Sequence, residues 1–213
     1  MSSTRKSSGL RLAVVLLAAG EGSRLGSMPK ALLRKDGKTL LEIFCVSVKQ
    51  LTPVEFLVIT GFHAQAIEAE LKNISQSLKF PVTIQHNSNA QQGQGSSVRL
   101  ALQSLSSEYD VLAIGLSDQP NIGATELQSL LEQFEHCNTK EQIVMPMVNG
   151  QRGNPVLFSR QTVEEILSMP GMVCRAYMDQ HPERIHIFET NNPAFILDVD
   201  TDADIRKLGV SRS

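Results

Sequence analysis

The sequence predicts an α/β fold with a mostly parallel β-sheet, and three observations lead to this prediction. Residues 12–19 (LAVVLLAA) are apolar at every position, as expected of a strand buried on both faces. Apolar runs of strand length then alternate with helical patterns, which is the order of βαβ units. A glycine-rich turn follows the first run. Ligands of such sheets bind beyond the carboxyl ends of the strands, so we expect the functional residues there.

The first half of the chain contains further strands separated by helices. The motif TLLE at residues 39–42 is a capping box and begins a helix that we expect to end near Leu51, before Pro53. The residues 96–105 have the amphipathic pattern of a helix. The expected strands are 55–60, 81–86 and 110–116, and the expected helices are 39–51, 63–72 and 96–105.

The second half continues the alternation with shorter elements. A second capping pattern, TELQ at residues 125–128, begins a helix expected to reach Phe134. The dipeptide Asn149-Gly150 is typical of a hairpin turn between two strands. The expected strands are 142–148, 155–158, 184–189 and 195–199, and the expected helices are 162–168 and 202–208.

Composition favours one domain that folds without metal or disulfides. The chain has 213 residues, 41% of them hydrophobic, and a formal net charge of −2. A near-neutral chain lacks the basic field that holds a nucleic-acid backbone, so no nucleic-acid partner is expected. The three cysteines form no CxxC pair, and the five histidines lack metal-ligand spacing, so no zinc site is expected from the sequence. Reduced thiols favour a cytoplasmic location.

The amino-terminal residues divide into a tail and the first strand. Residues 1–10 (MSSTRKSSGL) are polar and serine-rich, which predicts a disordered tail before a single domain over residues 11–213. The apolar run 12–19 is about half the length of a membrane span and leads into Gly-Glu-Gly, so neither a membrane anchor nor a signal peptide is expected.

The turn after the first strand has the chemistry of a phosphate-binding loop. Glycines at positions 20, 22 and 26 allow a tight turn with exposed N–H groups, and Arg24 and Lys30 add positive charge. The turn contains no Gly-Lys-Ser/Thr, which excludes a P-loop, and its glycine spacing does not fit GxGxxG. From these residues alone, a βα turn with surface basic residues remains an alternative.

Aspartates stand at two predicted strand ends. Asp118 follows the strand 110–116, and Asp198 and Asp200 would point to the same side of an extended segment. Carboxylates beside phosphates suit Mg²⁺. We expect Asp118 and Asp200 to bind the metal, with Asp198 as the alternative to Asp200. These acids could instead serve turn initiation before Pro120 and helix capping after Asp200.

Two polar segments complete the candidate site. The loop 87–97 carries Gly93, Gly95 and Ser96, whose backbone and hydroxyl groups could read a base edge, although its composition also suits a solvated loop. Arg152 and Asn154 lie just after the Asn149-Gly150 turn, where an exposed arginine on a hairpin is the simpler interpretation.

The motifs together resemble those of molybdenum cofactor cytidylyltransferases. LAAGEGSRLG followed by Pro29-Lys30, then GQGSS, SDQP, RGNPVLF and DVDT, occur in that family's order between about residues 12 and 208. The resemblance implies a Rossmann-like three-layer α/β/α nucleotidyltransferase fold. It implies that CMP is transferred from CTP to molybdopterin, with release of pyrophosphate and with Mg²⁺. A molybdenum hydroxylase or a cofactor-insertion protein would be the protein partner.

The resemblance also assigns roles to residues. Nucleotide-binding residues would be Leu17, Ala18, Ala19, Gly20, Gly22, Ser23, Arg24, Lys30, Gly93, Gly95 and Ser96. Catalytic residues would be Arg24, Lys30 and Asp118, and acceptor-binding residues would be Gln119, Arg152 and Asn154. Guanylyl relatives usually carry Gly-Gly at the position of Ala18-Ala19, which favours CTP over GTP.

Two departures from the family pattern leave alternatives for the acceptor. The family commonly has His at the position of Asn154, and a Gly-Asp-x-Gly-Ala-Arg stretch where this chain reads GMVCR at residues 171–175. Transfer to a sugar phosphate or a methylerythritol phosphate, guanylyl transfer, and a non-catalytic cofactor chaperone are the alternatives. A redox role for the bound nucleotide is disfavoured by the poor fit to the dinucleotide fingerprint.

Overall fold

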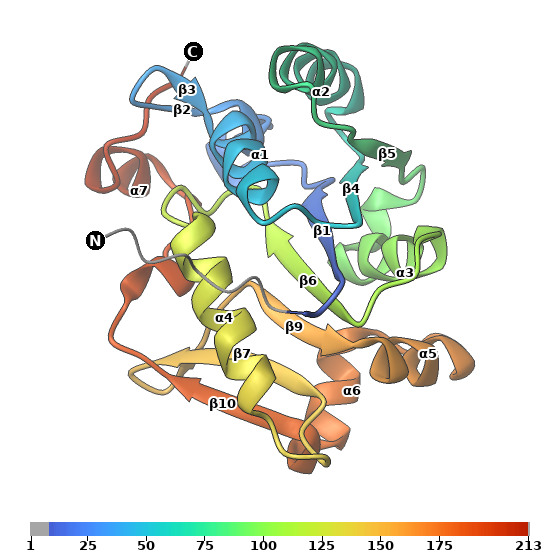
Figure 1. Ribbon diagram of the computed structural model, residues 1–213. Helices are drawn as coiled ribbons and strands as arrows, with labels where there is room; N and C mark the ends of the chain where they lie inside the picture. Colours follow the sequence, from blue (N-terminus) through green and yellow to red (C-terminus); the bar gives the residue numbers. More distant parts are fainter. Residues whose placement is uncertain (1–8, 213) are drawn as a thin grey trace, which may run out of the picture.

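A computed structural model describes residues 9–212 and contains a central eight-stranded sheet (Figure 1). The strands lie in the order β10-β7-β9-β6-β1-β4-β5, and β8 pairs with β7. Their bounds are β1 Leu12–Ala18, β4 Glu55–Thr60, β5 Thr83–His86, β6 Val111–Leu116, β7 Ile143–Val148, β8 Gln151–Arg152, β9 Val156–Ser159 and β10 Ile185–Glu189. The predicted tail falls mostly on residues 1–8, which lie outside the described residues, so the tail remains a prediction.

The sheet is mostly parallel, as predicted. The first strand pairs in parallel with β4 and with β6, β4 pairs in parallel with β5, and β7 pairs in parallel with β10. Strand β9 is antiparallel to both of its neighbours, β6 and β7. The strands β1, β4 and β6 therefore end at the same edge of the sheet.

Helices cover both faces of the sheet. They are α1 Leu40–Gln50, α2 Ala64–Leu78, α3 Gln94–Ser104, α4 Ala124–His136, α5 Arg160–Ser168, α6 Cys174–Gln180 and α7 Asp202–Lys207. One apolar core contains residues of α1, α2 and α4, and a second contains residues of α3, α5 and α6. Alternate residues of β1 belong to the two cores, Val14 and Leu16 to the first and Val15 and Leu17 to the second, which explains why this strand is apolar throughout. The result is the three-layer α/β/α arrangement.

A third, smaller cluster joins the chain's carboxyl-terminal part to the loop after β1. It contains Leu25, Leu33, Leu40, Val199 and Val210, all buried. A two-stranded hairpin, β2 Arg34–Lys35 and β3 Lys38–Thr39, packs nearby, and the Arg34 amide donates to the Ser211 carbonyl at 2.8 Å. This packing brings the segment around Val199 beside the glycine-rich turn.

One predicted strand is wrong. Residues 195–199, all described by the structure, form no strand; a 3-10 turn, Pro193–Phe195, ends at the first of them. The Asn192 side chain accepts from the Ala194 amide at 3.0 Å and starts this turn. The Phe195 carbonyl accepts from the Asn154 amide and from the Gln119 side chain, so it makes no ladder hydrogen bond.

Several helices differ from the prediction at their ends; α3 and α5, for example, each begin two residues earlier than predicted. The helix α4 begins at Ala124, because Glu126 accepts from the Gly123 amide at 3.0 Å, and Thr125 does not cap it. The helix α2 continues to Leu78, beyond the predicted end at residue 72, and buries Ile67, Leu71 and Ile74 on one face. The sequence pattern did not predict α6, which has seven residues.

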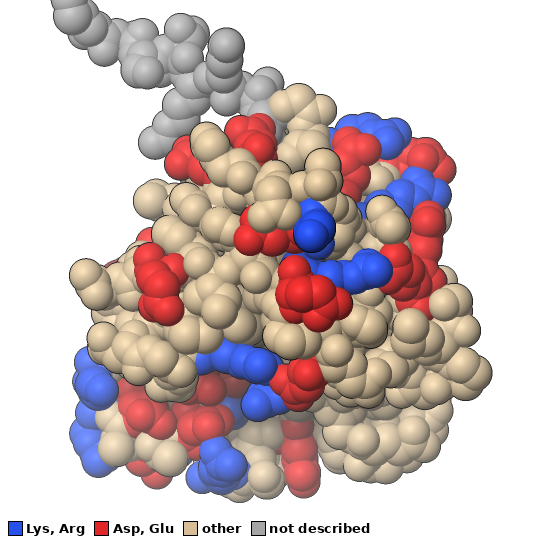
Figure 2. All heavy atoms as spheres, turned by 90° about the horizontal axis from the view of Figure 1, so that it is seen from below, with Lys and Arg blue, Asp and Glu red and all other residues tan. Residues whose placement is uncertain are grey.

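Within residues 9–212, none of the helices is both long enough and apolar enough to cross a bilayer. The face in Figure 2 carries basic and acidic side chains interspersed, without a continuous basic stripe along it.

Candidate nucleotide and metal site

A cleft of about 570 Å³ lies at the carboxyl ends of β1 and β6. Its walls come from the turn after β1, the loop before α3, and the two acidic segments. The predicted site residues that line it are Leu17, Ala18, Ala19, Gly20, Gly22, Ser23, Arg24, Lys30, Gly93, Asp118, Asp198 and Asp200. Most of the predicted nucleotide-binding residues and all three candidate metal ligands therefore share one cavity.

The turn after β1 has a fixed shape centred on Gly22. This residue has φ 68°, and its carbonyl accepts from the Leu25 amide at 2.9 Å and from the Ser27 amide at 3.1 Å. A Cβ at position 22 would lie 2.1 Å from the Met28 carbonyl oxygen. Only glycine fits this close approach and this backbone conformation. The turn therefore holds Arg24 and Lys30 in place beside the cleft.

Lys30 lies between two acidic side chains that are distant in the sequence. Its Nζ lies 3.0 Å from Oδ2 of Asp118 and 2.5 Å from Oδ1 of Asp200. The Nη1 atom of Arg24 lies 2.7 Å from the other carboxylate oxygen of Asp200. Two cations and two carboxylates thus form one hydrogen-bonded cluster that lines the cleft.

Burial and neighbouring charges shift the pKa values of Asp198 and Lys30 in the cleft. Burial raises the pKa of Asp198 above its ordinary value, and the neighbouring carboxylates of Asp118 and Asp200 raise it further. Burial lowers the pKa of Lys30, but the carboxylates of Asp118 and Asp200 outweigh this, and the net shift is upward. The cleft therefore holds an excess of negative charge around a lysine that stays protonated at neutral pH.

Backbone hydrogen bonds fix the two acidic segments side by side. The Val199 amide donates to the Asp118 carbonyl at 3.0 Å, and the Ser117 amide donates to the Leu17 carbonyl at 3.2 Å. Thr201 and Asp204 form a capping box at the start of α7, directly after Asp200. Val199 is fully buried, so Asp198 and Asp200 on either side of it both face the cleft, although no strand forms there.

The acidic cluster fits a divalent cation. One carboxylate oxygen from each of Asp118, Asp198 and Asp200 lies within 4.8 Å of the others. A set of carboxylate oxygens open to a cavity is the donor chemistry that Mg²⁺ takes, since Mg²⁺ also keeps water or phosphate ligands. Asp118 and Asp200 could hold such an ion, and Asp198 lies close enough to do so as well.

A second cavity of about 360 Å³ adjoins the cleft and shares Leu17, Gln94 and Leu116 with it. Gly95, Arg152 and Asn154 line this second cavity and do not line the cleft. Arg152 is paired with Asp179, Nη1 to Oδ1 at 2.6 Å. The structure thus separates the predicted acceptor residues from the predicted phosphate-binding residues but keeps them adjacent.

Two predicted site residues line neither cavity. Ser96 donates to the carbonyl groups of Asn89 and Gly93 and holds the loop before α3. Gln119 is buried, and its Nε2 donates to the Phe195 carbonyl at 3.0 Å. The structure therefore places Ser96 and Gln119 as supports of the loops around the site.

Several cleft residues were not named from the sequence. Phe62 lines the cleft with 48% of its surface exposed, and Gln91 and Ser97 line it as well. Phe62 follows the carboxyl end of β4, so the strand-end rule that located Asp118 could have found it. Arg175 lines the second cavity, in the segment where the sequence departs from the family pattern.

Two known proteins are similar to this chain in sequence. Bifunctional protein GlmU of Prochlorococcus marinus is 29% identical over 153 residues, which are 71% of this chain and 32% of GlmU. A nicotine blue oxidoreductase of Paenarthrobacter nicotinovorans is 28% identical over 200 residues, covering 91% of this chain and 94% of that protein. This chain therefore spans about a third of the first relative and nearly all of the second.

Solved structures share the fold. The crystal structure of Rv0371c from Mycobacterium tuberculosis H37Rv has a TM-score of 0.73 at 23% identity, covering 93% of this chain and 97% of that chain. A complex of Rv0371c with manganese has a TM-score of 0.65 at 22% identity, covering 93% and 97%. Residues 14–185 match the family described as MobA-like NTP transferase domain. This match includes the glycine-rich turn and Asp118, and we conclude that the chain belongs to the MobA-like NTP transferase domain family.

Proposed function

We propose that this protein is a cytoplasmic nucleotidyltransferase that transfers CMP from CTP to molybdopterin and releases pyrophosphate. The observation that carries the proposal is the cluster in which Lys30 bridges Asp118 and Asp200 in the cleft that the Gly22 turn also lines. A triphosphate needs backbone N–H donors, cations and a divalent ion, and the cleft gathers residues suited to all three.

The residues of the chain supply positioning and charge. Amides of the turn after β1 would bind phosphate oxygens, and Arg24 and Lys30 would exchange part of their contact with Asp200 for contact with the β- and γ-phosphates. Mg²⁺ held by Asp118 and Asp200 would neutralise charge on the phosphates. An acceptor phosphate oxygen attacks the α-phosphorus in line, a P–O bond to it forms, and the bond to pyrophosphate breaks. An ionised acceptor phosphate needs no general base, so the rate depends on alignment and on stabilisation of the leaving group.

We propose CTP as the donor because of the two alanines at the end of β1. Ala18 and Ala19 line the cleft where guanylyl relatives usually have two glycines, and both side chains are buried. Their methyl groups reduce the space beside the base, which favours a pyrimidine over a purine.

The choice of acceptor rests on the second cavity. It is large enough for a small organic phosphate, and Arg152 and Arg175 at its walls suit an anionic acceptor. In molybdenum cofactor cytidylyltransferases, the family that the motifs resemble, this acceptor is molybdopterin. A molybdenum hydroxylase or a cofactor-insertion protein would then receive the product.

Three other functions remain distinguishable. Another acceptor, such as a sugar phosphate or methylerythritol phosphate, would use the same cleft. A non-catalytic cofactor chaperone would not need the metal cluster. The relative named nicotine blue oxidoreductase covers nearly the whole chain and makes redox chemistry the alternative from another class. The lysine–aspartate cluster favours phosphoryl chemistry over hydride transfer.

Pyrophosphate release with purified protein tests the proposal. The assay pairs CTP or GTP with molybdopterin, a sugar phosphate or methylerythritol phosphate, each with and without Mg²⁺. Release that needs CTP, molybdopterin and Mg²⁺ together supports the proposal. Release with another acceptor changes the acceptor, and tight molybdopterin binding without release indicates a chaperone. Reduction or oxidation of a dye substrate with a nicotinamide cofactor, without pyrophosphate release, would favour the redox alternative.

A further inference from the structure

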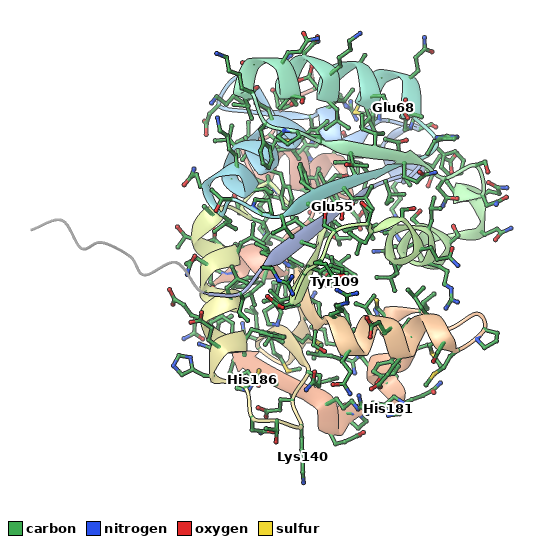
Figure 3. All side chains as sticks on the ribbon, turned by 45° about the vertical axis from the view of Figure 1, so that its right-hand side comes forward. Glu55, Glu68, Tyr109, Lys140, His181 and His186 are labelled. Carbon is green, nitrogen blue, oxygen red and sulfur yellow. The ribbon has the colours of Figure 1, made fainter. Side chains whose placement is uncertain are left out.

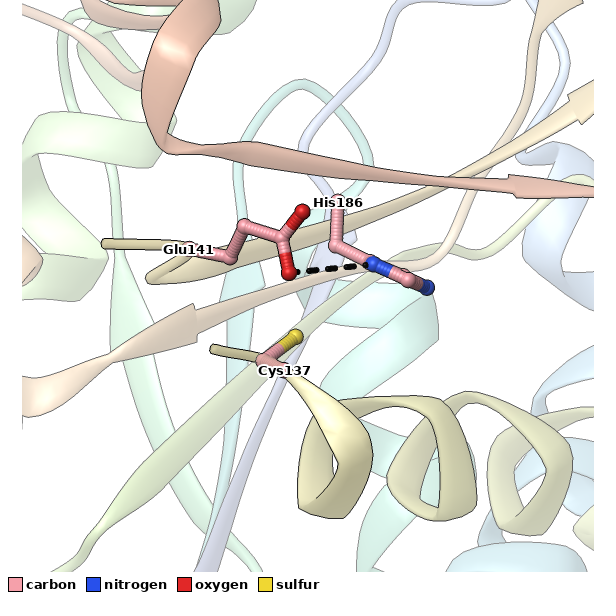
Figure 4. A group of neighbouring side chains, drawn as sticks. All are labelled: Cys137, Glu141 and His186. Carbon is pink, nitrogen blue, oxygen red and sulfur yellow. Dashed lines mark hydrogen bonds and ion pairs between the residues drawn. The ribbon is translucent and has the colours of Figure 1, made fainter. Parts of the chain in front are cut away.

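Cys137, Glu141 and His186 point toward one another at a place remote from the cleft (Figure 4). One ligand atom from each lies within 4.8 Å of the others. His186 Nδ1 lies 3.3 Å from Glu141 Oε2, and both side chains are about one quarter exposed. A thiol, an imidazole and a carboxylate therefore converge at a spot that an ion can reach.

The cluster sits at the opposite end of the sheet strands from Asp118. Cys137 follows α4, Glu141 precedes β7, and His186 is near the start of β10, paired with Val144. Figure 3 shows His186 near the β10 edge of the sheet, far from Glu68 of α2, which lies near the opposite edge. Because β6, β7 and β10 run in the same direction, their starting ends lie away from the carboxyl ends that form the cleft. The nucleotide chemistry makes no use of these three side chains.

The histidine has a partner on its other ring nitrogen. His186 Nε2 lies 3.4 Å from Oε1 of Gln133, which can only accept a hydrogen bond. Both ring nitrogens face oxygen acceptors, so without a metal either nitrogen can carry the proton. A metal ion bound by Nδ1 and Glu141 would select the tautomer that carries the proton on Nε2 and donates it to Gln133. This is the arrangement of metal-binding histidines, which donate their second N–H to an oxygen that fixes the tautomer.

We propose that Cys137, Glu141 and His186 form a binding site for a thiophilic divalent transition-metal ion, Zn²⁺ in first place. Sulfur, nitrogen and oxygen donors in one set select zinc or cobalt over Mg²⁺. Three protein ligands leave a fourth position for water, as in open zinc sites. Metal binding replaces the thiol proton with an S–metal bond, and the proton goes to solvent. The bound ion ties the end of α4 to the edge strand β10.

The sequence did not indicate this site, because its ligands lack a recognisable spacing. Glu141 and His186 are 45 positions apart and meet only because β7 and β10 pair. The simpler alternative is a surface histidine–glutamate ion pair beside an unrelated thiol. The two interpretations differ in whether sulfur binds a metal.

Cobalt(II) titration of the full-length protein under reducing conditions tests the site. A sulfur-to-cobalt charge-transfer band reports the Co–S bond. Cobalt bound by Asp118, Asp198 and Asp200 does not produce this band, because these ligands contain no sulfur. The wild type is expected to show this band at one equivalent, and Zn²⁺ should abolish it by displacing cobalt. Cys137→Ser should remove the band, and Gln133→Leu should weaken cobalt binding by about 10–100-fold while keeping the band.

Cys174→Ser and Cys45→Ser are the matched controls, since both of these cysteines are buried elsewhere. Both variants should keep the band. His186→Gln provides a second variant if Cys137→Ser does not fold, as judged by circular dichroism, and it should lower the affinity at least about tenfold. No band in the wild type at saturating cobalt, or a band that survives in Cys137→Ser, would overturn the proposal.

Discussion

Lys30 and Asp200 stand 170 positions apart in the sequence, yet Nζ of Lys30 lies 2.5 Å from Oδ1 of Asp200. The two residues come from the turn after the first strand and from the segment before the last helix. The same ammonium also contacts Asp118 at 3.0 Å. The charged cluster in the cleft therefore forms only when the turn after β1, the segment after β6 and the segment before α7 come together around Lys30.

Lys30→Ala is expected to lower kcat by about 10²–10³-fold, because it removes a cation that stabilises the leaving pyrophosphate. Steady-state pyrophosphate release would measure the change, with circular dichroism to verify folding. Lys38→Ala serves as the control, since Lys38 is exposed and its ion pair, with Glu42 at 3.7 Å, lies outside the cleft. Wild-type turnover in Lys30→Ala would refute the assigned role.

Metal binding is expected to depend on the acidic cluster. Loss of a group that only orients a metal ligand typically weakens metal binding by roughly 10–100-fold. Asp118→Asn removes a ligand itself, so it should weaken Mn²⁺ binding by more than this. Isothermal titration calorimetry with Mn²⁺ would measure the dissociation constant, and EDTA should stop turnover. Parallel titration of Asp198→Asn and Asp200→Asn would identify the second ligand as the variant with the larger loss.

Asp202→Asn is a suitable control for these variants. Asp202 is the first residue of α7, close in sequence to Asp200, but it is exposed and paired with Arg212. The variant should bind Mn²⁺ as the wild type does. Equal binding by Asp118→Asn and the wild type would mean that the carboxylates do not hold the ion.

Gly22→Ala is expected to damage the phosphate loop. Its backbone is left-handed at φ 68°, which costs a non-glycine residue about 1–2 kcal/mol, and its Cβ would meet the Met28 carbonyl at 2.1 Å. Gly26→Ala carries the same kind of backbone cost at φ 77° but meets no atom within 4 Å. The dissociation constant for CTP should therefore rise much more in Gly22→Ala than in Gly26→Ala. Similar constants for the two variants would show that the close approach to Met28 is unimportant.

The sequence predicted the central strands well because they are buried on both faces. The run at residues 12–19 contains no polar position, and the strand 55–60 was predicted with the observed bounds. The segment 195–199 has similar apolar content, yet tertiary contacts of the Phe195 carbonyl prevent strand pairing. The local sequence pattern cannot show that the Phe195 carbonyl accepts from distant amides and not from a neighbouring strand.

The candidate site was predictable where it follows strand ends and unpredictable where it depends on packing. Asp118 and the Gly22 turn lie directly after strands. Phe62 also follows a strand, but a single exposed aromatic residue carries no motif. Gln119 adjoins Asp118 in sequence, and only the packing of Phe195 shows that its side chain turns inward.

The pair Arg11–Asp110 is expected to make stability depend on pH at low pH. Hydrogen bonds from the Arg11 side chain and amide lower the pKa of Asp110 to about 2. A carboxyl whose folded pKa is depressed stabilises the fold above its unfolded pKa, about 3.9, and loses this contribution as the pH falls through about 2. Asp110→Asn should therefore lower the Tm near neutral pH, and the difference from wild type should shrink between about pH 4 and pH 2. A Tm difference that stays constant over this range would contradict the assignment.

Phe62→Ala is expected to weaken nucleotide binding. The ring lines the cleft and is 48% exposed, so it can stack on a base or cover a ribose that enters from the turn after β1. A stacking contact contributes about 0.5–1.5 kcal/mol, which corresponds to a rise in KM for CTP of roughly 2–12-fold with little change in kcat. Ile187→Ala is the matched control, because Ile187 is 47% exposed on β10 and lines neither cavity. An unchanged KM in Phe62→Ala would place the base elsewhere in the cleft, whereas a fall in kcat at constant KM would mean that the ring aligns the reacting phosphates.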